Sequence, residues 1–339
     1  MLEINGAEGG GQLLRSALTL SLCTGTPFRM HGIRAGRSKP GLMRQHLTAV
    51  LAAAEIGGAD VTGAAPGAQD LVFVPGAVRG GDYRFSIGTA GSTTLVLQTL
   101  LPALCAAAEP STVVLEGGTH NPMAPPADFL IQAYAPLLRQ MGVDVGIELQ
   151  RYGFYPAGGG RLSVAIRPAA LQPLTLLARG ACQSRNACAL ISAVPSTVAE
   201  RELAAVARRL GYADAELAHR ALRPAAGPGN VLSVTLQFEH VTEVFVGFGE
   251  RGIRAEAVAE RVCEQVEAYV KSGAAVGPHL ADQLLLPLAL AGGGVFTTTT
   301  PTDHLTTNAA LIEKFVAVDI QIEKVDSARN CWQVSVSRY

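Results

Sequence analysis

The sequence has few features of a membrane protein, a secreted protein or a zinc protein. Its apolar runs near Leu95 and Leu284 are too short to cross a bilayer, and Pro102 and Pro287 interrupt them. The first residues include neither the charged nor the apolar segment of a secretory signal. The six cysteines are scattered, without the paired spacing of a disulfide scaffold or a zinc site. We therefore expect a reduced, cytoplasmic protein that makes no membrane contact.

Common nucleotide-binding and metal-binding motifs are also scarce. No G-x-x-x-x-G-K-[ST] sequence occurs, so a bound nucleotide would be held without a P-loop. Neither H-E-x-x-H nor C-x-x-C occurs, which argues against a tightly held zinc. Gly247-Phe248-Gly249-Glu250-Arg251-Gly252 does match G-x-G-x-x-G, but no acidic-tipped strand follows its helix to complete a βαβ unit. We interpret it as a tight turn.

Charge is sparse, at 16% of the 339 residues, and the formal net charge is −1. A nucleic-acid partner would therefore have to meet a local basic patch. Residues 9–54 contain no acidic side chain, and their basic residues are Arg15, Arg29, Arg34, Arg37, Lys39 and Arg44. A solvated face would explain this run as well. However, the cluster at 34–40 offers forked guanidinium donors that suit phosphate oxygens, so we favour a phosphate or RNA site.

A repeated order of elements is the main pattern that the sequence does contain. Residues 8–76, 88–168 and 275–339 each read as helix, strand, loop, helix and two strands. Repeats of one such unit usually pack around a pseudo-axis, which buries faces that no single unit could bury. The strand-to-helix loops at 34–40, 117–126 and 300–308 are then equivalent by position.

Residues 180–274 break this pattern. They read as strands near 187–194, 231–238 and 242–247, with helices at 198–210 and 255–269 and a loop at 223–229. This is enough for a compact inserted domain. We therefore predict a protein of the α/β (α+β) class, with a large catalytic repeat domain at 1–179 and 275–339 and a smaller α/β domain at 180–274.

The third loop carries His304, the strongest candidate for catalysis. It lies between a β-branched run and a helical pattern, where the unpaired amides of a helix start hold anionic groups well. A capping loop is the alternative, because Asp303, Thr306, Thr307 and Asn308 all suit helix starts.

Other segments allow both a structural and a functional interpretation. Three glycines in Glu8-Gly9-Gly10-Gly11-Gln12 would expose amides to a ligand, but glycines also permit close helix packing. The proline-rich second loop is either a rigid connector or a shelf for a base, with Pro125 or Phe129 beneath it. Asp282 is either an ordinary first-turn acid or, with Gln283, a partner for sugar hydroxyls and a base edge. The segment 151–160 reads as a hairpin.

Taken together, these segments resemble the RNA 3′-terminal phosphate cyclases over nearly the whole chain. The combination is specific although each piece is weak, and it consists of Glu8-Gly9-Gly10-Gly11-Gln12, Ile33-Arg34-Ala35-Gly36-Arg37-Ser38-Lys39-Pro40-Gly41-Leu42, Gly91-Ser92-Thr93, Gly153-Phe154-Tyr155-Pro156-Ala157-Gly158-Gly159-Gly160, Ala281-Asp282-Gln283 and His304-Leu305-Thr306-Thr307-Asn308. The resemblance implies a large domain of three βαβαββ-type repeats, related to the enolpyruvyl transferases, with a smaller inserted domain. It also implies ATP-dependent conversion of an RNA 3′-phosphate into a 2′,3′-cyclic phosphate, with release of AMP and pyrophosphate.

The resemblance also implies a role for each site residue. His304 would carry the AMP covalently, and Glu8 would hold a divalent metal, Mg²⁺ or Mn²⁺, or the phosphate-side geometry. Arg15, Arg34, Arg37 and Gln45 would contact phosphates. The adenosine would be surrounded by Gln98, Pro125, Phe129, His279, Asp282 and Gln283. His279 replaces a tyrosine that is frequent in the family, and Asn5 lies near a position that is commonly Asp.

Two other functions remain open. A cyclase-like ribosome-assembly protein would share the fold but lack the nucleophile, and His304 argues against it. An enolpyruvyl transferase would use phosphoenolpyruvate and form no protein adenylate. The resemblance is compatible with a monomer and with a homodimer.

Overall fold

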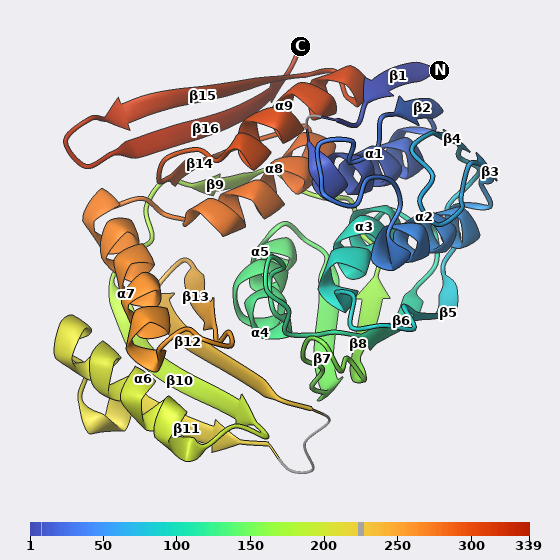
Figure 1. The fold of residues 1–339 in the computed structure, drawn as a ribbon. Helices are drawn as coiled ribbons and strands as arrows, with labels where there is room; N and C mark the ends of the chain where they lie inside the picture. The colour runs from blue at the N-terminus through green and yellow to red at the C-terminus, as the bar shows by residue number, and fades with distance from the viewer. Residues whose placement is uncertain (8, 223–226) are drawn as a thin grey trace.

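The computed structural model describes residues 1–7, 9–222 and 227–339 and has a mixed α/β fold (Figure 1). Three four-stranded sheets share one topology, with strand orders β1-β2-β4-β3, β5-β6-β8-β7 and β9-β14-β16-β15. In each sheet the first pair of strands is parallel and the other pairs are antiparallel. A parallel pair needs a crossover connection, and α1, α3 or α8 lies in each of these connections. The expected α/β repeat fold is confirmed.

The first repeat consists of β1 (Leu2–Asn5), α1 (Gly10–Thr24), β2 (Phe28–His31), α2 (Arg44–Gly57), β3 (Asp60–Thr62) and β4 (Leu71–Val74). The second consists of β5 (Gly81–Ser86), α3 (Thr93–Cys105), β6 (Ser111–Gly117), α4 (Ala127–Phe129), a π-helical turn at Leu130–Tyr134, α5 (Ala135–Gln140), β7 (Asp144–Arg151) and β8 (Gly160–Arg167). The third consists of β9 (Leu174–Leu176), α8 (Pro278–Ala291), β14 (Gly293–Thr298), α9 (Asp303–Phe315), β15 (Val318–Asp326) and β16 (Cys331–Arg338).

Between β9 and α8 the chain forms a fourth sheet, of order β11-β10-β12-β13, with two helices that pack against it and against each other. Its elements are β10 (Cys182–Ser192), α6 (Ser196–Leu210), a 3₁₀ turn at Asp214–Glu216, β11 (Leu217–Ala221), β12 (Gly229–Phe238), β13 (Thr242–Phe248) and α7 (Ala255–Ser272). Part of the predicted loop at 223–229 lies outside the described residues. The proposed domain boundaries at 179/180 and 274/275 remain predictions.

The central core lies where the helices of the repeats meet. α1 contacts α2, α3 and α9, and Leu14, Leu18, Leu97 and Leu311 are almost fully buried there. Burial of one such leucine contributes about 1.5–3 kcal/mol. Gly25 ends α1 in the left-handed region, at φ 71°, and donates its amide to Ser21 O. This packing aligns the starts of α1 and α9 on one side of the core.

The structure differs from the predicted order of elements in one respect. Each repeat begins with a strand that the sequence pattern missed, because β1, β5 and β9 are short or largely exposed. α2 begins at Arg44, since Met43 is extended, with φ −80° and ψ 167°. In the second repeat, a π-helical turn divides the helix that follows the proline-rich loop.

Two further observations concern the predicted insert and the hairpin. The pattern missed β11, whose side chains are nearly all exposed. The predicted hairpin at 151–160 is present between β7 and β8, where Gly158 and Gly159 adopt φ 69° and 74°.

Among the described residues, no helix combines the length and the apolarity that a membrane span requires.

Candidate active site

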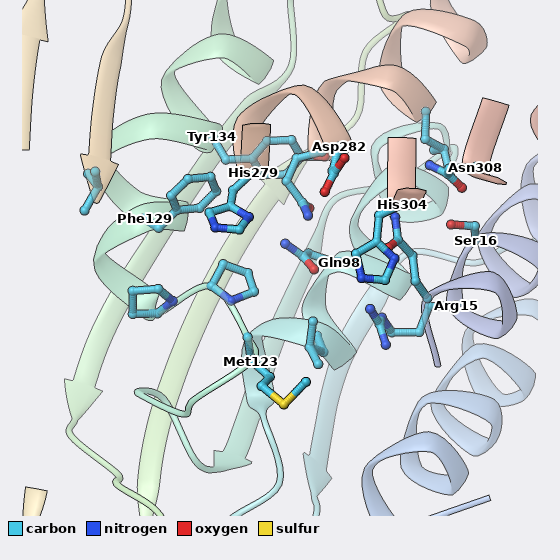
Figure 2. A pocket seen from close by; sticks show the side chains of 18 of the residues that line it. Arg15, Ser16, Gln98, Met123, Phe129, Tyr134, His279, Asp282, His304 and Asn308 are labelled. Carbon is cyan, nitrogen blue, oxygen red and sulfur yellow. The ribbon is translucent and has the colours of Figure 1, made fainter. Parts of the chain in front are cut away.

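A cavity of about 410 Å³ lies where α1, α3, α8 and α9 approach one another (Figure 2). Its floor and sides are formed by these helices together with the proline-rich loop before α4. Most of the predicted site residues line it: Arg15, Gln98, Pro125, Phe129, His279, Asp282, Gln283 and His304. The structure thus brings together residues that lie up to 289 positions apart in the sequence, namely Arg15 and His304.

The start of α9 positions His304. The prediction placed this residue in a loop, but α9 already begins at Asp303, and His304 lies in its first turn. Thr302 caps the helix, with its Oγ1 accepting a hydrogen bond from Leu305 N at 3.0 Å. The same hydroxyl donates to Asp282 Oδ1 at 2.6 Å. A side chain of α8 therefore fixes the helix turn that carries the histidine.

His304 is exposed and borders the cavity beside Arg15, as Figure 2 shows. Partial burial of the ring, and then the positive charges of Arg15 and Arg37, lower the pKa of His304 below 6.5. A lowered pKa keeps the imidazole neutral near pH 7, with a free lone pair on one ring nitrogen. Burial lowers the pKa of Arg15 to about 10, so that guanidinium remains a cation at neutral pH. The site thus combines a neutral imidazole with positive charge.

The other predicted phosphate ligands lie outside this set of lining residues. Arg34 donates from Nη1 to Lys39 O and to Gly41 O, both at 2.8 Å, and so ties its own loop together. Arg37 is exposed and lies against Gly10, where an added Cβ would come within 3.3 Å of its Nη2. Gln45 Oε1 accepts from Ser92 N at 3.0 Å. The roles of Arg34, Arg37 and Gln45 toward phosphate remain predictions.

Glu8, the predicted metal or phosphate-side residue, lies outside the described residues. Within the described part of the chain, no three His, Cys, Asp or Glu side chains stand together in a way that could hold a metal ion.

The α8 side of the cavity contains two unusual ionisable groups. Asp282 is the fifth residue of α8, not a first-turn acid as one interpretation had it, and its side chain is 8% exposed. Burial raises the pKa of Asp282 to about 6, although the Thr302 hydrogen bond opposes this. Burial, and then the nearby His304, lower the pKa of His279. At neutral pH this wall carries a neutral imidazole and a largely ionised carboxylate.

One wall of the cavity was not predicted from the sequence. Val244, Val246 and Phe248 of β13 and Gln265 of α7 also line it. In addition, Glu243 Oε1 accepts from Gly277 N, the N-cap residue of α8, at 2.5 Å. The G-x-G-x-x-G motif, which includes Phe248, was the only sequence motif near this wall. Such a motif is typical of a dinucleotide site, which does not predict a wall of this cavity.

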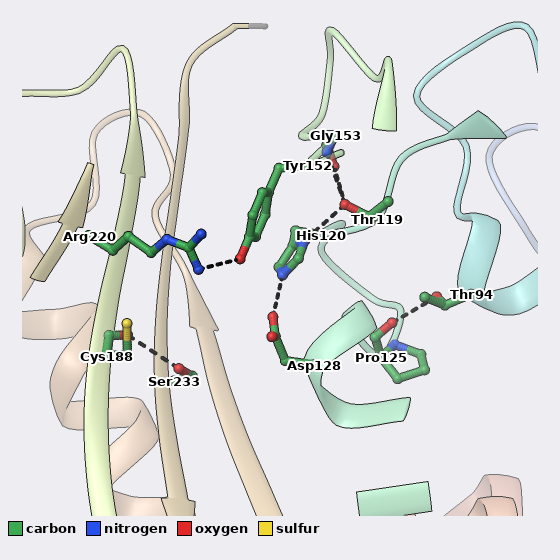
Figure 3. A network of polar contacts seen from close by, with 10 residues as sticks. All are labelled: Thr94, Thr119, His120, Pro125, Asp128, Tyr152, Gly153, Cys188, Arg220 and Ser233. Carbon is green, nitrogen blue, oxygen red and sulfur yellow. Dashed lines mark hydrogen bonds and ion pairs between the residues drawn. The ribbon is translucent and has the colours of Figure 1, made fainter. Parts of the chain in front are cut away.

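The proline-rich loop is held by polar contacts on both sides (Figure 3). Pro125 O accepts from Thr94 Oγ1 at 2.7 Å, and Asp128 Oδ2 lies 2.7 Å from His120 Nε2. His120 also packs against the ring of Tyr152, whose hydroxyl accepts from Arg220 Nη1 at 3.0 Å. These contacts fix the position of Pro125 and Phe129 at the cavity.

The fold and the cavity define a mixed α/β repeat protein with a site that combines a histidine, a cation and apolar side chains. The sequence model of the family described as RNA 3′-terminal phosphate cyclase matches residues 6–322. A Pseudomonas fluorescens protein named RNA 3′-terminal phosphate cyclase is 57% identical over 321 residues, which cover 95% of this chain and 94% of that protein. A protein of the same name from Salmonella paratyphi C is 52% identical over 341 residues, with coverages of 100% and 98%. The chain belongs to the RNA 3′-terminal phosphate cyclase family and is an enzyme of the ligase class.

The structure also has a weak likeness to the enolpyruvyl transferase NikO from Streptomyces tendae. The TM-score is 0.37 at 12% identity, and the match covers 98% of this chain and 48% of that one. A likeness at this level carries no argument about fold or function.

Proposed function

We propose that the protein converts an RNA 3′-terminal phosphate into a 2′,3′-cyclic phosphate, with ATP as the energy source and a covalent His304–AMP intermediate. Membership of the family supports the overall reaction. The observation that carries the mechanism is the placement of His304, exposed at the start of α9 with a lowered pKa and with Arg15 on the same cavity.

The reaction requires three displacements at phosphorus. The neutral His304 imidazole attacks the α-phosphorus of ATP, a P–N bond forms, and the bond to pyrophosphate breaks. An oxygen of the RNA 3′-phosphate then attacks the same phosphorus and releases the imidazole, which gives an RNA–AMP anhydride. Finally, the adjacent 2′-hydroxyl attacks the 3′-phosphorus, loses its proton to solvent and expels AMP. The 2′-oxygen lies next to the 3′-phosphorus in the same nucleotide, so proximity favours ring closure.

The cavity offers complementary surfaces to the parts of ATP. Arg15 supports the phosphates, because a cation beside the α-phosphate offsets the charge that develops during attack. Pro125, Phe129 and the neutral ring of His279 form apolar surfaces suited to a purine. Asp282 and Gln283 provide acceptors and a donor for ribose hydroxyls and a base edge. We assign the adenosine to this side of the cavity.

We propose that Mg²⁺ or Mn²⁺ enters with ATP, bound to the triphosphate oxygens. Mg²⁺ is commonly held by substrate phosphates with one or two carboxylates, and the described residues contain no larger cluster that would hold it alone. We also propose that the enzyme acts in the cytoplasm, since its six cysteines are all free in the structure.

The test is to incubate the protein with α-labelled ATP and Mg²⁺, without RNA, and to separate it by denaturing electrophoresis. Wild type and His219→Ala, which changes an exposed histidine on β11, should retain label, and His304→Ala should not. RNA with a 3′-phosphate should then discharge the label as AMP. Unlabelled, well-folded wild type would refute the proposal and would leave the non-catalytic protein and the enolpyruvyl transferase as the alternatives.

A further inference from the structure

A second and larger cavity, of about 980 Å³, lies between the 120–122 and 154–156 loops on one side and the ends of β12 and β13 with the starts of α6 and α7 on the other. It shares Phe248 with the active-site cavity. It also shares Pro122, Tyr155 and Pro156 with a cavity of about 450 Å³ beside Ser92, which in turn meets the active-site cavity at Met123 and Ala124. The second cavity therefore adjoins the active-site cavity both directly and by way of the cavity beside Ser92.

The second cavity has the surfaces that a single-stranded nucleic acid needs. The half-buried ring of Phe248 provides an aromatic face, and Val198 and Val258 extend the apolar wall. Phe154 also lines the cavity but is only 4% exposed, because its ring packs against His120 and Tyr152. Arg251 and Arg254 are exposed at its edge, and neither forms an ion pair with any residue that the structure describes. A third arginine of the lining, Arg201, is paired with Glu256 at 2.6 Å, and Glu250 is an acid on the same edge. Aromatic faces flanked by cations are typical of single-strand binding surfaces.

Two buried polar side chains line the cavity with unused hydrogen-bonding capacity. Glu202 is 0% exposed and Asn230 is 8% exposed, and Asn230 Nδ2 donates to Glu202 Oε2 at 3.0 Å. Glu202 Oε1 and Asn230 Oδ1 have no partner among the described residues. A buried acceptor without a donor costs about 1–3 kcal/mol, so such atoms call for a partner. The exocyclic amino groups of adenine, cytosine and guanine are donors of the right type.

We propose that this cavity binds a nucleotide of the RNA upstream of its 3′ end. A base would pack against Phe248 and would donate to Glu202 and Asn230, while Arg251 and Arg254 would bind the adjoining phosphates. The proposal rests on the proposed function, because it requires RNA with its terminal phosphate at His304. RNA is favoured over a peptide because, among the described residues, two unpaired arginines stand against one unpaired acid, Glu250, at the edge, and because the cavity adjoins the active-site cavity at Phe248.

The test measures AMP transfer from preformed enzyme–adenylate to RNA in a single turnover. The reference substrate is a 3′-phosphorylated RNA of about ten adenosines. The comparison substrates are RNAs of the same length in which a single nucleotide, the second, third, fourth or fifth from the 3′ end, lacks its base. With wild type, one abasic position should raise the half-saturating RNA concentration about tenfold, a typical effect of one lost base–aromatic stack. Glu202→Gln places an amide donor opposite the amino group of the base, so it should weaken the binding of intact RNA. In this variant the abasic position should no longer raise the half-saturating RNA concentration.

The edge arginines give a second, independent readout. In Arg251→Ala/Arg254→Ala the affinity for intact RNA should fall, and the slope of log affinity against log salt should flatten by about 1.4, or 0.7 per phosphate contact. Arg261→Ala, which changes an exposed arginine of α7, is the matched control and should keep the wild-type slope. For each variant, the amount of AMP transferred to RNA is divided by the amount of enzyme–adenylate that was present before RNA was added.

Equal transfer to intact and abasic RNAs by wild type would overturn the proposal, as would an unchanged salt slope in the double arginine variant. Either result would also be expected if the cavity received a peptide or protein instead. Failure of the proposed function would look different, because wild type would then form no adenylate before RNA is added.

Discussion

The hydrogen bond from Thr302 to Asp282 leads to a specific prediction about how His304 is positioned. Thr302→Val removes a hydroxyl that both caps α9 and donates to a buried carboxylate, with almost no change in side-chain shape. Loss of an N-cap costs about 1 kcal/mol. Leaving a buried acceptor without its donor costs about 1–3 kcal/mol more. We therefore expect the free energy of unfolding to fall by roughly 2–4 kcal/mol.

The catalytic effect should exceed what this loss of stability explains, because His304 is only two residues beyond the cap. A displacement of about 1 Å at a reacting group can reduce the rate about 100-fold. We expect adenylation of Thr302→Val at saturating ATP to be about 10–100 times slower than that of wild type. Thr302→Ser keeps a capping hydroxyl and should restore most of the rate.

Thr306→Val is the matched control for this substitution. Thr306 lies in the same helix and is exposed, and its hydroxyl contacts only carbonyls of the preceding turn. Its replacement should change stability by less than about 0.5 kcal/mol. Urea unfolding and single-turnover adenylation measure the two effects separately. If Thr302→Val adenylates as fast as Thr306→Val, the hydrogen bond from Thr302 to Asp282 does not position His304, and our interpretation of it is wrong.

Two pH-dependent effects follow from the same site. Partial burial and the charges of Arg15 and Arg37 lower the pKa of His304, so the adenylation rate of wild type should fall only below pH 6.5. Arg37→Gln removes one of these charges and should shift this acid limb of the pH–rate profile to higher pH. Because burial raises the pKa of Asp282 from 3.8 to about 6, the folded state binds its proton more tightly than the unfolded state does. The free energy of unfolding should therefore fall by up to about 3 kcal/mol as the pH rises through this interval, and Asp282→Asn should lose that dependence in urea titrations at each pH.

The repeat architecture could be predicted because its helices carry strong local signals. Glycines end α1 and α8, and apolar side chains recur at helical spacing within them. The first strand of each repeat carries no such signal. β9 has three residues and pairs with β14, more than a hundred positions away, so its structure depends on a contact that local patterns do not contain. The π-helical turn after Phe129 likewise has no marker in the sequence.

The side of the cavity formed by the repeats could also be predicted, since the motifs around Arg15, Asp282 and His304 are distinctive in combination. The opposite side could not. Val244 and Val246 look like ordinary strand residues, and they border the cavity only because β13 lies across from α8. Similarly, the sequence does not show that the backbone at Arg34 adopts φ 55° or that its guanidinium donates to the carbonyls of its own loop. The role of Arg34 toward phosphate remains a prediction.

The position of the inserted segment in the chain explains why it lines the candidate active-site cavity. The segment leaves the third repeat after β9 and returns at Gly277, the N-cap residue of α8. The chain must therefore re-enter the repeat beside the helix that carries His279 and Asp282. Glu243 secures this junction by accepting a hydrogen bond from the Gly277 amide, and the burial of this contact raises the pKa of Glu243 to about 8. This junction explains how β13 comes to line the same cavity as His279 and Asp282.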